Sequence, residues 1–291
     1  MGYGDGIIIV DKPAGWTSHD VVAKLRGALK IKRVGHGGTL DPMATGVLPI
    51  FAGRATRAVE FCENSDKEYI AGLRLGIVTD TQDITGNILS TCEISISADE
   101  LRSVIPRFLG AQKQVPPMYS AIKIDGKKLY ELARRGIETE RPARDIIIHD
   151  IELLEGEDNE FILRVACSKG TYIRSLCHDI GAVLGCGGAM SSLRRIRAGA
   201  FTIDTAQTLD DILAAIHSGN ISKCVIPIDA VFSMYPAMTI DDGDMRKCMN
   251  GAPAHIIGSS DGIYRVYGPD NAFLALGEVE GGVLRTIKSF Y

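Results

Sequence analysis

The chain is organised around the stretch Gly35-His36-Gly37-Gly38-Thr39-Leu40-Asp41-Pro42-Met43-Ala44-Thr45-Gly46. Asp41 is its only carboxylate, and three of its four glycines come before Asp41. Glycine allows positive φ and close approach to a ligand, while Pro42 fixes its own φ and keeps Asp41 out of the α region. The stretch therefore predicts a rigid extended turn that presents one acid. The same pattern also fits a plain turn in which Asp41 only bonds the backbone.

The glycines of this stretch do not form a phosphate-binding loop, because no Lys-Ser or Lys-Thr follows them and the GxGxxG spacing is absent. The apolar run Val47 to Phe51 comes next and would anchor the turn to a core. Upstream, Ile7 to Val10 predicts a buried strand and Asp11 to Gly15 predicts a turn. Thr17 or Ser18 can then cap a helix whose apolar residues recur at helical spacing.

Composition limits the class of protein. The 291 residues suit one large domain or two, and 45% hydrophobic with 23% charged residues is ordinary for a soluble globular chain. No apolar run approaches the roughly 20 residues that span a bilayer, and no signal peptide opens the chain, so we expect a cytoplasmic protein. The seven cysteines are odd in number and widely spaced, without a Cys-x-x-Cys pair. We expect reduced, mostly buried thiols and no metal site.

The charge is unevenly distributed. A net charge of −4 argues mildly against a nucleic-acid partner, for which a basic domain is typical. Three basic clusters nevertheless stand out, although each also fits a solvated surface. They are Lys24, Arg26, Lys30, Lys32 and Arg33; Lys123, Lys127, Lys128, Arg134 and Arg135; and Arg194, Arg195 and Arg197. If these clusters hold phosphates, binding should weaken steeply with salt.

Three later segments combine a regular pattern with notable polar residues. The stretch Lys67 to Ile77 alternates as a strand does and carries Tyr69 on its apolar face, where a core tyrosine is common. Pro116-Pro117 breaks the chain before a hairpin that turns at Asp125-Gly126. The segment ending at Arg174 leads into a helix, and a surface salt bridge in the first turn would explain that arginine.

These segments resemble the motifs of the bacterial tRNA pseudouridine-55 synthases, the TruB family, and they come in the family's order. The matching segments are Asp11-Lys12-Pro13-Ala14-Gly15, Gly35 to Gly46, Lys67-Glu68-Tyr69 with Thr79 to Asp83, Met118 to Lys123, Ser168 to Arg174, and Leu193-Arg194-Arg195. Specific motifs extend from Ile7 to Arg195, and the resemblance beyond Asp229 is weak.

The resemblance implies roles for nine residues. Asp41 would be catalytic, Arg174 would pair with it, and Tyr69 would pack against the target base. The substrate-binding residues would be His36, which enters the RNA loop where the base has left, Leu193 as an apolar wall, Lys12 in the floor of the site, Tyr119 and Lys123 supporting the pocket, and Asp83 in the second motif. Considered without the family, His36 would suit a loop imidazole bonded to the backbone.

The fold expected from the patterns and the resemblance is α+β. We expect a pseudouridine-synthase-like catalytic domain over residues 1–228, with a large mixed or antiparallel sheet and flanking helices. A linker at Ile226 to Asp229 would lead to a small β-rich, PUA-like RNA-binding domain over residues 229–291. This last segment holds five basic and eight acidic residues, so its charge alone does not predict RNA binding.

The chemistry implied by the resemblance needs few groups. Pseudouridine formation breaks the N-glycosidic bond of a uridine, turns the base and rejoins it through C5, without redox change, so we expect no cofactor. A carboxylate must act as nucleophile or on the sugar, and a cationic Arg174 would keep Asp41 ionised. A stacked uridine must also be flipped out, at a cost of about a few kcal/mol. The expected partner is the T-arm loop of tRNA, modified at uridine 55 by a monomer without an obligate protein partner.

Three other functions stay open at this point. An RNA chaperone would help tRNA to fold, and catalysis would be secondary. A guide-RNA-dependent synthase of the same superfamily would work within a protein complex, although the compact chain favours a stand-alone enzyme. A glycosidase or other hydrolase would need a second carboxylate roughly 5–10 Å from Asp41, and the matched motifs supply none that we can assign.

Overall fold

The computed structural model describes residues 5–120, 122–124 and 126–291, and the side chain of Lys123 lies outside this description. The described chain divides into two compact units. Unit 1 holds residues 5–42, 46–63 and 198–291, and unit 2 holds residues 43–45 and 64–197. Unit 1 therefore combines the N-terminal strands with the C-terminal region of the sequence.

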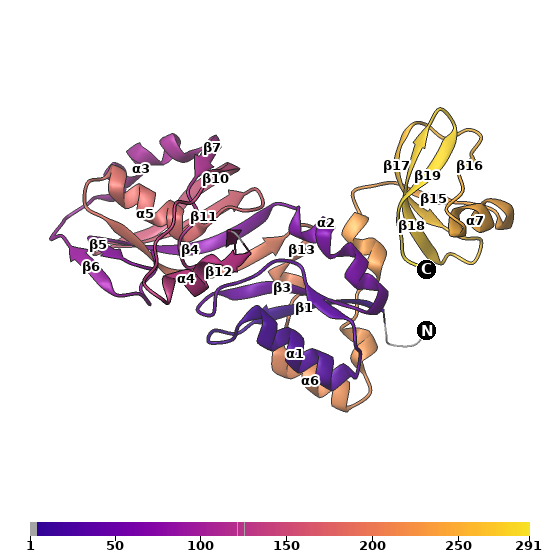
Figure 1. Ribbon diagram of the computed structural model, residues 1–291, viewed down its shortest axis with the longest axis horizontal. Helices are drawn as coiled ribbons and strands as arrows, with labels where there is room; N and C mark the ends of the chain where they lie inside the picture. The colour runs from indigo at the N-terminus through magenta and orange to yellow at the C-terminus, as the bar shows by residue number, and fades with distance from the viewer. Residues whose placement is uncertain (1–4, 121, 125) are drawn as a thin grey trace. The chain divides into compact units, whose positions relative to one another are not determined.

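In the N-terminal part of unit 1, strands follow the order β14-β1-β3, with β2 beside β3. β1 runs antiparallel to β3, with Val10 opposite Leu48, and parallel to β14. Helices α1 and α6 lie side by side next to these strands (Figure 1). The elements are β1 (Gly6–Lys12), α1 (Ser18–Leu29), β2 (Val34–His36), β3 (Thr45–Ala52), η1 (Gly53–Ala58), α2 (Val59–Glu63), β13 (Phe201–Thr202), η3 (Ile203–Thr205), β14 (Gln207–Thr208), α6 (Leu209–His217) and η4 (Ile221–Lys223).

Helix α1 forms where the sequence predicts it. Thr17 is the N-cap, and it forms a capping box with Asp20. The apolar side chains of Val21, Val22 and Leu25 are buried, whereas the basic residues occupy the exposed side of the helix. The buried face of α1 therefore holds in place the chain that leads into the Asp41 stretch.

Unit 2 is built on strands in the order β12-β4-β11-β10-β7. The pairs from β4 to β7 are antiparallel, with Tyr69 of β4 opposite Val165 of β11. The strand predicted over Lys67–Ile77 divides at Gly76, whose φ of +82° turns the chain into a separate hairpin. The elements are β4 (Lys67–Leu75), β5 (Ile77–Thr79), β6 (Ile88–Thr91), α3 (Ala98–Val104), η2 (Ile105–Phe108), β7 (Gly110–Gln114), β8 (Lys123–Ile124), β9 (Lys127–Lys128), α4 (Leu129–Ala133), β10 (Arg144–Glu157), β11 (Glu160–Cys167), α5 (Ile173–Val183) and β12 (Gly188–Ala198).

The C-terminal region forms a five-stranded sheet with its own apolar cluster. Its order is β15-β17-β18-β19-β16, and Val266, Leu274 and Leu284 are among the buried residues. The elements are η5 (Ile228–Phe232), β15 (Ala237–Thr239), α7 (Asp242–Met249), β16 (Ala254–His255), β17 (Gly262–Tyr267), β18 (Phe273–Glu280) and β19 (Val283–Ser289). The predicted α+β fold, with a large mixed sheet and a small β-rich C-terminal domain, is confirmed.

The segment predicted as a linker is packed rather than loose. Ile226 forms a β-bridge with Ile7, with backbone hydrogen bonds of 2.7 and 2.9 Å in the two directions. Phe232 is 1% exposed, and its ring centroid lies 5.0 Å from that of Phe61 and 5.6 Å from that of Phe290. These contacts belong to an apolar cluster shared by β1, β3, α2 and the C-terminal sheet. The N-terminal strands and the C-terminal domain are thus stabilised by one core.

Candidate active site

The backbone after Asp41 is held by a buried lysine. The ammonium of Lys12 is fully buried and donates to the carbonyl oxygens of Pro13, Trp16 and Pro42, at 2.9, 2.7 and 3.3 Å. Burying a charge is costly unless its hydrogen bonds are satisfied, and these carbonyls satisfy three of them. The side chain predicted to support the floor of the site therefore fixes the residue that follows Asp41.

The backbone before Asp41 is held by a serine. Ser18 Oγ accepts the N–H of Leu40 at 2.9 Å and donates to the carbonyl of Leu40 at 3.2 Å. Ser18 is 1% exposed and Leu40 is 3% exposed, so water does not compete for these bonds. Asp41, itself half-buried, is thus mounted between two anchored neighbours.

Two glycines of the stretch are required by geometry. A Cβ on Gly37 would lie 2.7 Å from Cys62 Sγ and 2.8 Å from Phe51 Cε2, so a side chain does not fit there. Gly38 has φ of +114°, a conformation that other residues rarely adopt. His36, just before them, ends β2 and makes an edge contact with the ring of His19, with centroids 5.2 Å apart.

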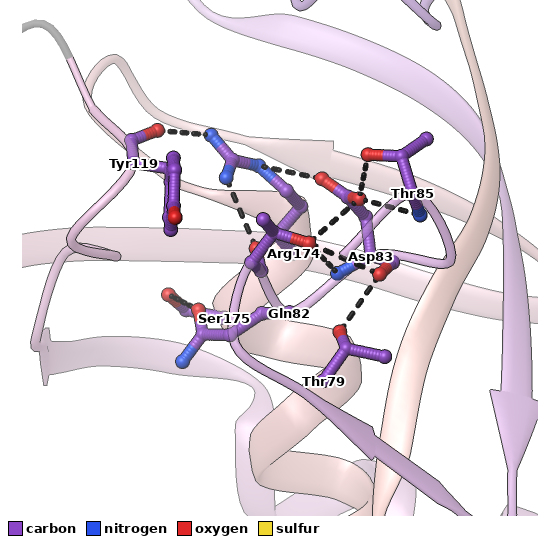
Figure 2. Close-up of polar contacts among 8 residues, drawn as sticks. Thr79, Gln82, Asp83, Thr85, Tyr119, Arg174 and Ser175 are labelled. Atoms are coloured by element: carbon purple, nitrogen blue, oxygen red, sulfur yellow. Dashed lines mark hydrogen bonds and ion pairs between the residues drawn. The ribbon is translucent and has the colours of Figure 1, made fainter. Parts of the chain in front are cut away.

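In unit 2, Arg174 lies in the first turn of α5 and is 4% exposed, which excludes a surface salt bridge. Its Nη2 donates to the carbonyl of Tyr119 at 2.8 Å, and its Nη1 donates to the carbonyl of Thr81 at 3.1 Å. Its Nε lies 3.8 Å from Oδ2 of Asp83 (Figure 2). The guanidinium is therefore fixed by groups from two separate loops.

Asp83 is in turn held by the threonines around it. Its Oδ1 accepts from Thr81 Oγ1 at 2.8 Å and from the N–H and Oγ1 of Thr85 at 2.9 and 2.5 Å. Thr79 Oγ1 donates to the carbonyl of Asp83 at 2.7 Å (Figure 2). The Asp83 side chain is 7% exposed, so this buried carboxylate and Arg174 form a desolvated ion pair, and other partners hydrogen-bond each member.

The start of α5 is secured by side chains that the sequence did not single out. Gln114, 5% exposed, accepts the N–H of Tyr172 at 2.8 Å and donates to its carbonyl at 3.0 Å. Ser175 donates to Gln82 Oε1 at 2.8 Å (Figure 2). The residues on both sides of Arg174 are thus tied to neighbouring loops.

Strand β4 carries Tyr69, which is 9% exposed. Its neighbour Glu68 forms ion pairs with Arg164 of β11 and with Arg197 of β12, the latter at 3.1 Å. Desolvation works to raise the pKa of Glu68, but hydrogen bonds and charge from Arg197 and Arg164 hold that pKa below its ordinary value. The triad joins β4 to the strands on both sides of it.

The remaining predicted residues lie in unit 2. Leu193, 9% exposed, lies on β12, the strand next to β4. Lys123 begins β8, and the structure does not describe its side chain. In the cluster of Arg194, Arg195 and Arg197, only part faces solvent, because Arg195 is 1% exposed and Arg197 bonds Glu68.

The structure therefore assembles two groups of predicted residues. In unit 1, Lys12 supports the loop of Asp41, and His36 lies upstream in the same stretch. In unit 2, Tyr119, Asp83 and Arg174 meet directly. The pairing of Asp41 with Arg174, and the contact of Tyr69 with a base, remain predictions.

Among the described residues, Cys167, Cys177 and the potential metal ligands form no further reactive site. Burial raises the pKa of the Cys177 thiol to about 12 and that of Cys167 to about 11, so neither is a nucleophile at neutral pH. Within residues 5–120, 122–124 and 126–291, no cluster of three His, Cys, Asp or Glu side chains is arranged for a metal ion. Over the same residues, none of the helices has the length and apolar character that crossing a membrane requires.

The sequence matches two family models. The model described as TruB family pseudouridylate synthase (N terminal domain) covers residues 26–173. The model described as tRNA pseudouridylate synthase B C-terminal domain covers residues 174–233.

Relatives match almost the full chain. The tRNA pseudouridine synthase B of Clostridium kluyveri is 44% identical over 291 residues, covering 98% of this chain and 99% of the relative. That of Alkaliphilus oremlandii is 48% identical over 247 residues, covering 85% and 82%. Among solved structures, a Cbf5-Nop10-Gar1 complex matches with a TM-score of 0.76 and 29% identity, covering 98% of this chain and 85% of the other. Together with the fold, these matches show that the chain belongs to the TruB family of pseudouridylate synthases and is an isomerase.

Proposed function

We propose that this isomerase converts uridine 55 in the T-arm loop of tRNA to pseudouridine, as a stand-alone cytoplasmic monomer without a cofactor, with Asp41 as the catalytic carboxylate. The observation that carries the proposal is the mounting of Asp41 between Leu40, held by Ser18, and Pro42, held by Lys12. A carboxylate so constrained suits a reaction in which one acid acts on the sugar or the base.

In this proposal Arg174 supplies the positive charge that stabilises Asp41 and the developing charge of the reaction. Its planar guanidinium is held by two carbonyls and by Asp83, so it can be oriented before substrate arrives. The loss of any one of these partners would let the charge move relative to the reacting atoms.

The target uridine must leave the stack of the RNA loop before Asp41 can reach it. Tyr69 is proposed to stack on the flipped base and Leu193 to wall the pocket, each with about a tenth of its surface exposed. His36 is proposed to fill the place that the base leaves. Tyr119 and Lys123 would support the pocket.

The extent of identity favours a stand-alone enzyme over a guide-RNA-dependent one. Identity to bacterial tRNA pseudouridine synthase B relatives reaches 44% over nearly the whole of both chains, against 28–29% for the proteins of the Cbf5-Nop10-Gar1 and H/ACA RNP structures. We also propose a PUA-like RNA-binding role for residues 229–291, with the catalytic domain over residues 1–228.

The first experiment compares wild-type protein with Asp41→Asn on an unmodified tRNA transcript. Pseudouridine is then mapped with a chemical label that stops reverse transcription. A single wild-type stop in the T-arm loop, absent with Asp41→Asn, is expected. Stops with both proteins would remove Asp41 from the mechanism. No stop with either protein, combined with tight tRNA binding and faster tRNA folding, would favour the chaperone function instead.

A further inference from the structure

Two adjacent hydroxyls open helix α1, and they make different kinds of contact. Thr17 is the N-cap: its Oγ1 accepts from the N–H of Asp20 at 3.1 Å, and the Asp20 carboxylate accepts from the N–H of Thr17 at 2.9 Å. These bonds stay within the first turn and stabilise the helix itself. Thr17 therefore has a structural role that is local to α1.

Ser18 instead reaches out of the helix. Its Oγ accepts from the N–H of Leu40 at 2.9 Å and donates to the carbonyl of Leu40 at 3.2 Å, across 22 residues of sequence. One hydroxyl thus satisfies both backbone polar groups of a single residue in an extended loop. Leu40 is 3% exposed, so without Ser18 these two groups would be buried without this partner.

The position of Leu40 gives this contact its importance. Leu40 comes immediately before Asp41, and Pro42 immediately after it is held by Lys12 and by the N–H of Gly15, which donates to Pro42 at 2.8 Å. With both neighbours fixed, the Asp41 backbone has little freedom, and only its side-chain torsions remain. If the bond on the Leu40 side is lost, the loop keeps its attachment at Pro42 but can shift at Leu40.

We propose that Ser18 is a positioning residue of the reaction, which sets the backbone of Asp41 through Leu40 and contributes to turnover rather than to RNA affinity. This inference rests on the proposed catalytic role of Asp41. Ser18 is buried and acts only through the Leu40 backbone. A misplacement of about 1 Å at a reacting group can lower a rate by about a hundredfold, so the effect should be measurable.

The test compares Ser18→Ala with Thr17→Ala, a matched loss of the neighbouring hydroxyl. Each variant is measured for the single-turnover rate of pseudouridine formation, for the Kd of tRNA and for thermal stability. We expect Ser18→Ala to lower the single-turnover rate by about tenfold to a hundredfold with Kd changed less than about twofold. We expect Thr17→Ala to lower the melting temperature while the rate stays within about twofold of wild type. Ser18→Thr, which keeps the hydroxyl, should recover part of the rate.

Other results would contradict the proposed role of Ser18. Equal rate losses in Ser18→Ala and Thr17→Ala would assign both hydroxyls to helix stability, and a change in Kd alone would place Ser18 in RNA binding. If Ser18→Ala does not fold, Ser18→Cys, with a similar volume and a weak donor, is measured in its place. A wild-type rate in Ser18→Ala overturns the inference about Ser18 but leaves the proposed function intact, provided that Asp41→Asn is inactive. Activity in Asp41→Asn would contradict both the inference about Ser18 and the proposed role of Asp41.

Discussion

Arg174 and Asp83 are both nearly inaccessible to water, and this makes the pair sensitive to the loss of either member. In Arg174→Ala the Asp83 carboxylate stays buried without its cation. We therefore expect a loss of about 3–5 kcal/mol in the free energy of unfolding, in addition to a loss of turnover of about a hundredfold or more. The measurements are urea unfolding and single-turnover kinetics.

The double variant Arg174→Ala with Asp83→Asn separates these two effects. Removal of the buried negative charge should restore much of the stability, but turnover should stay low because the guanidinium is still missing. Full activity in the double variant, or unchanged turnover in Arg174→Ala, would show that Arg174 only balances Asp83 and takes no part in the reaction.

Some residues of the candidate site can be predicted from the sequence, and others cannot. The roles predicted for Asp41, Tyr69 and Arg174 come from the resemblance of their motifs to those of the TruB family, and they stay predictions. Ser18 and Gln114 could not be predicted, because their partners are backbone groups 22 and 58 residues away, and a backbone partner leaves no trace in the sequence. A serine in the first turn of a helix otherwise indicates only a cap.

Strand β4, which carries Tyr69, is joined to its neighbouring strands by the ion pairs of the titratable residue Glu68. Because Arg197 and Arg164 hold the pKa of Glu68 below its ordinary value in the folded protein, Glu68 binds a proton less readily there than in the unfolded chain. The stability it gives is present above the unfolded pKa of about 4.3 and is lost as pH falls through the folded value. We expect Glu68→Gln to cost about 1–2 kcal/mol at pH 7, a modest value because both arginines are partly exposed.

The difference between wild type and Glu68→Gln should shrink as the pH falls below about 4, as measured by thermal unfolding at a series of pH values. A difference that stays constant over the whole range would mean that the carboxylate's charge is not what joins β4 to its neighbours. Glu152→Gln is the matched control, because Glu152 also contacts Arg164 but lies exposed on β10.

Individual elements are predicted well where the signal is local. The helix cap predicted at Thr17 or Ser18 is confirmed, and Thr17 supplies it. Ser97 with Glu100 at α3 and Thr208 with Asp211 at α6 cap their helices with the same three-residue spacing. The alternation from Lys67 to Ile77 gave the strand type correctly but missed the break at Gly76. There the chain turns to bond Gly187, a residue far along the sequence, and alternation reports only on neighbours.

For the whole molecule, the shared apolar cluster determines how firmly the C-terminal domain is attached to the rest of unit 1. Phe232 contacts the rings of Phe61, Phe273 and Phe290. We expect Phe232→Ala to cost about 3–5 kcal/mol and to increase hydrogen exchange in both α2 and β19. Met234→Ala is the control, since Met234 is 68% exposed two residues later and should change neither quantity.

Exchange that rises only in β19 after Phe232→Ala would mean that the N-terminal part of unit 1, which contains α2, is stable without this core. The sequence could not predict the attachment, because Ile226 to Asp229 has the composition of a connecting segment. Its half-buried residues Ile226 and Ile228 pack against a cluster that includes Ile7 and Phe290, more than 30 positions away on either side, which only the folded chain brings close to this segment.

The shared cluster also has a consequence for the synthesis of the chain. Ile7 and Ile9 leave the ribosome early, yet their cluster includes Leu276 and Phe290, so part of the apolar surface around β1 stays uncovered until residue 290 has emerged. Contacts between such distant residues form slowly, and the exposed surface favours aggregation in the meantime. Residues 64–197 form most of unit 2 without a break, so this unit can fold while translation continues. We therefore expect the strand made first to be among the last to reach its final packing.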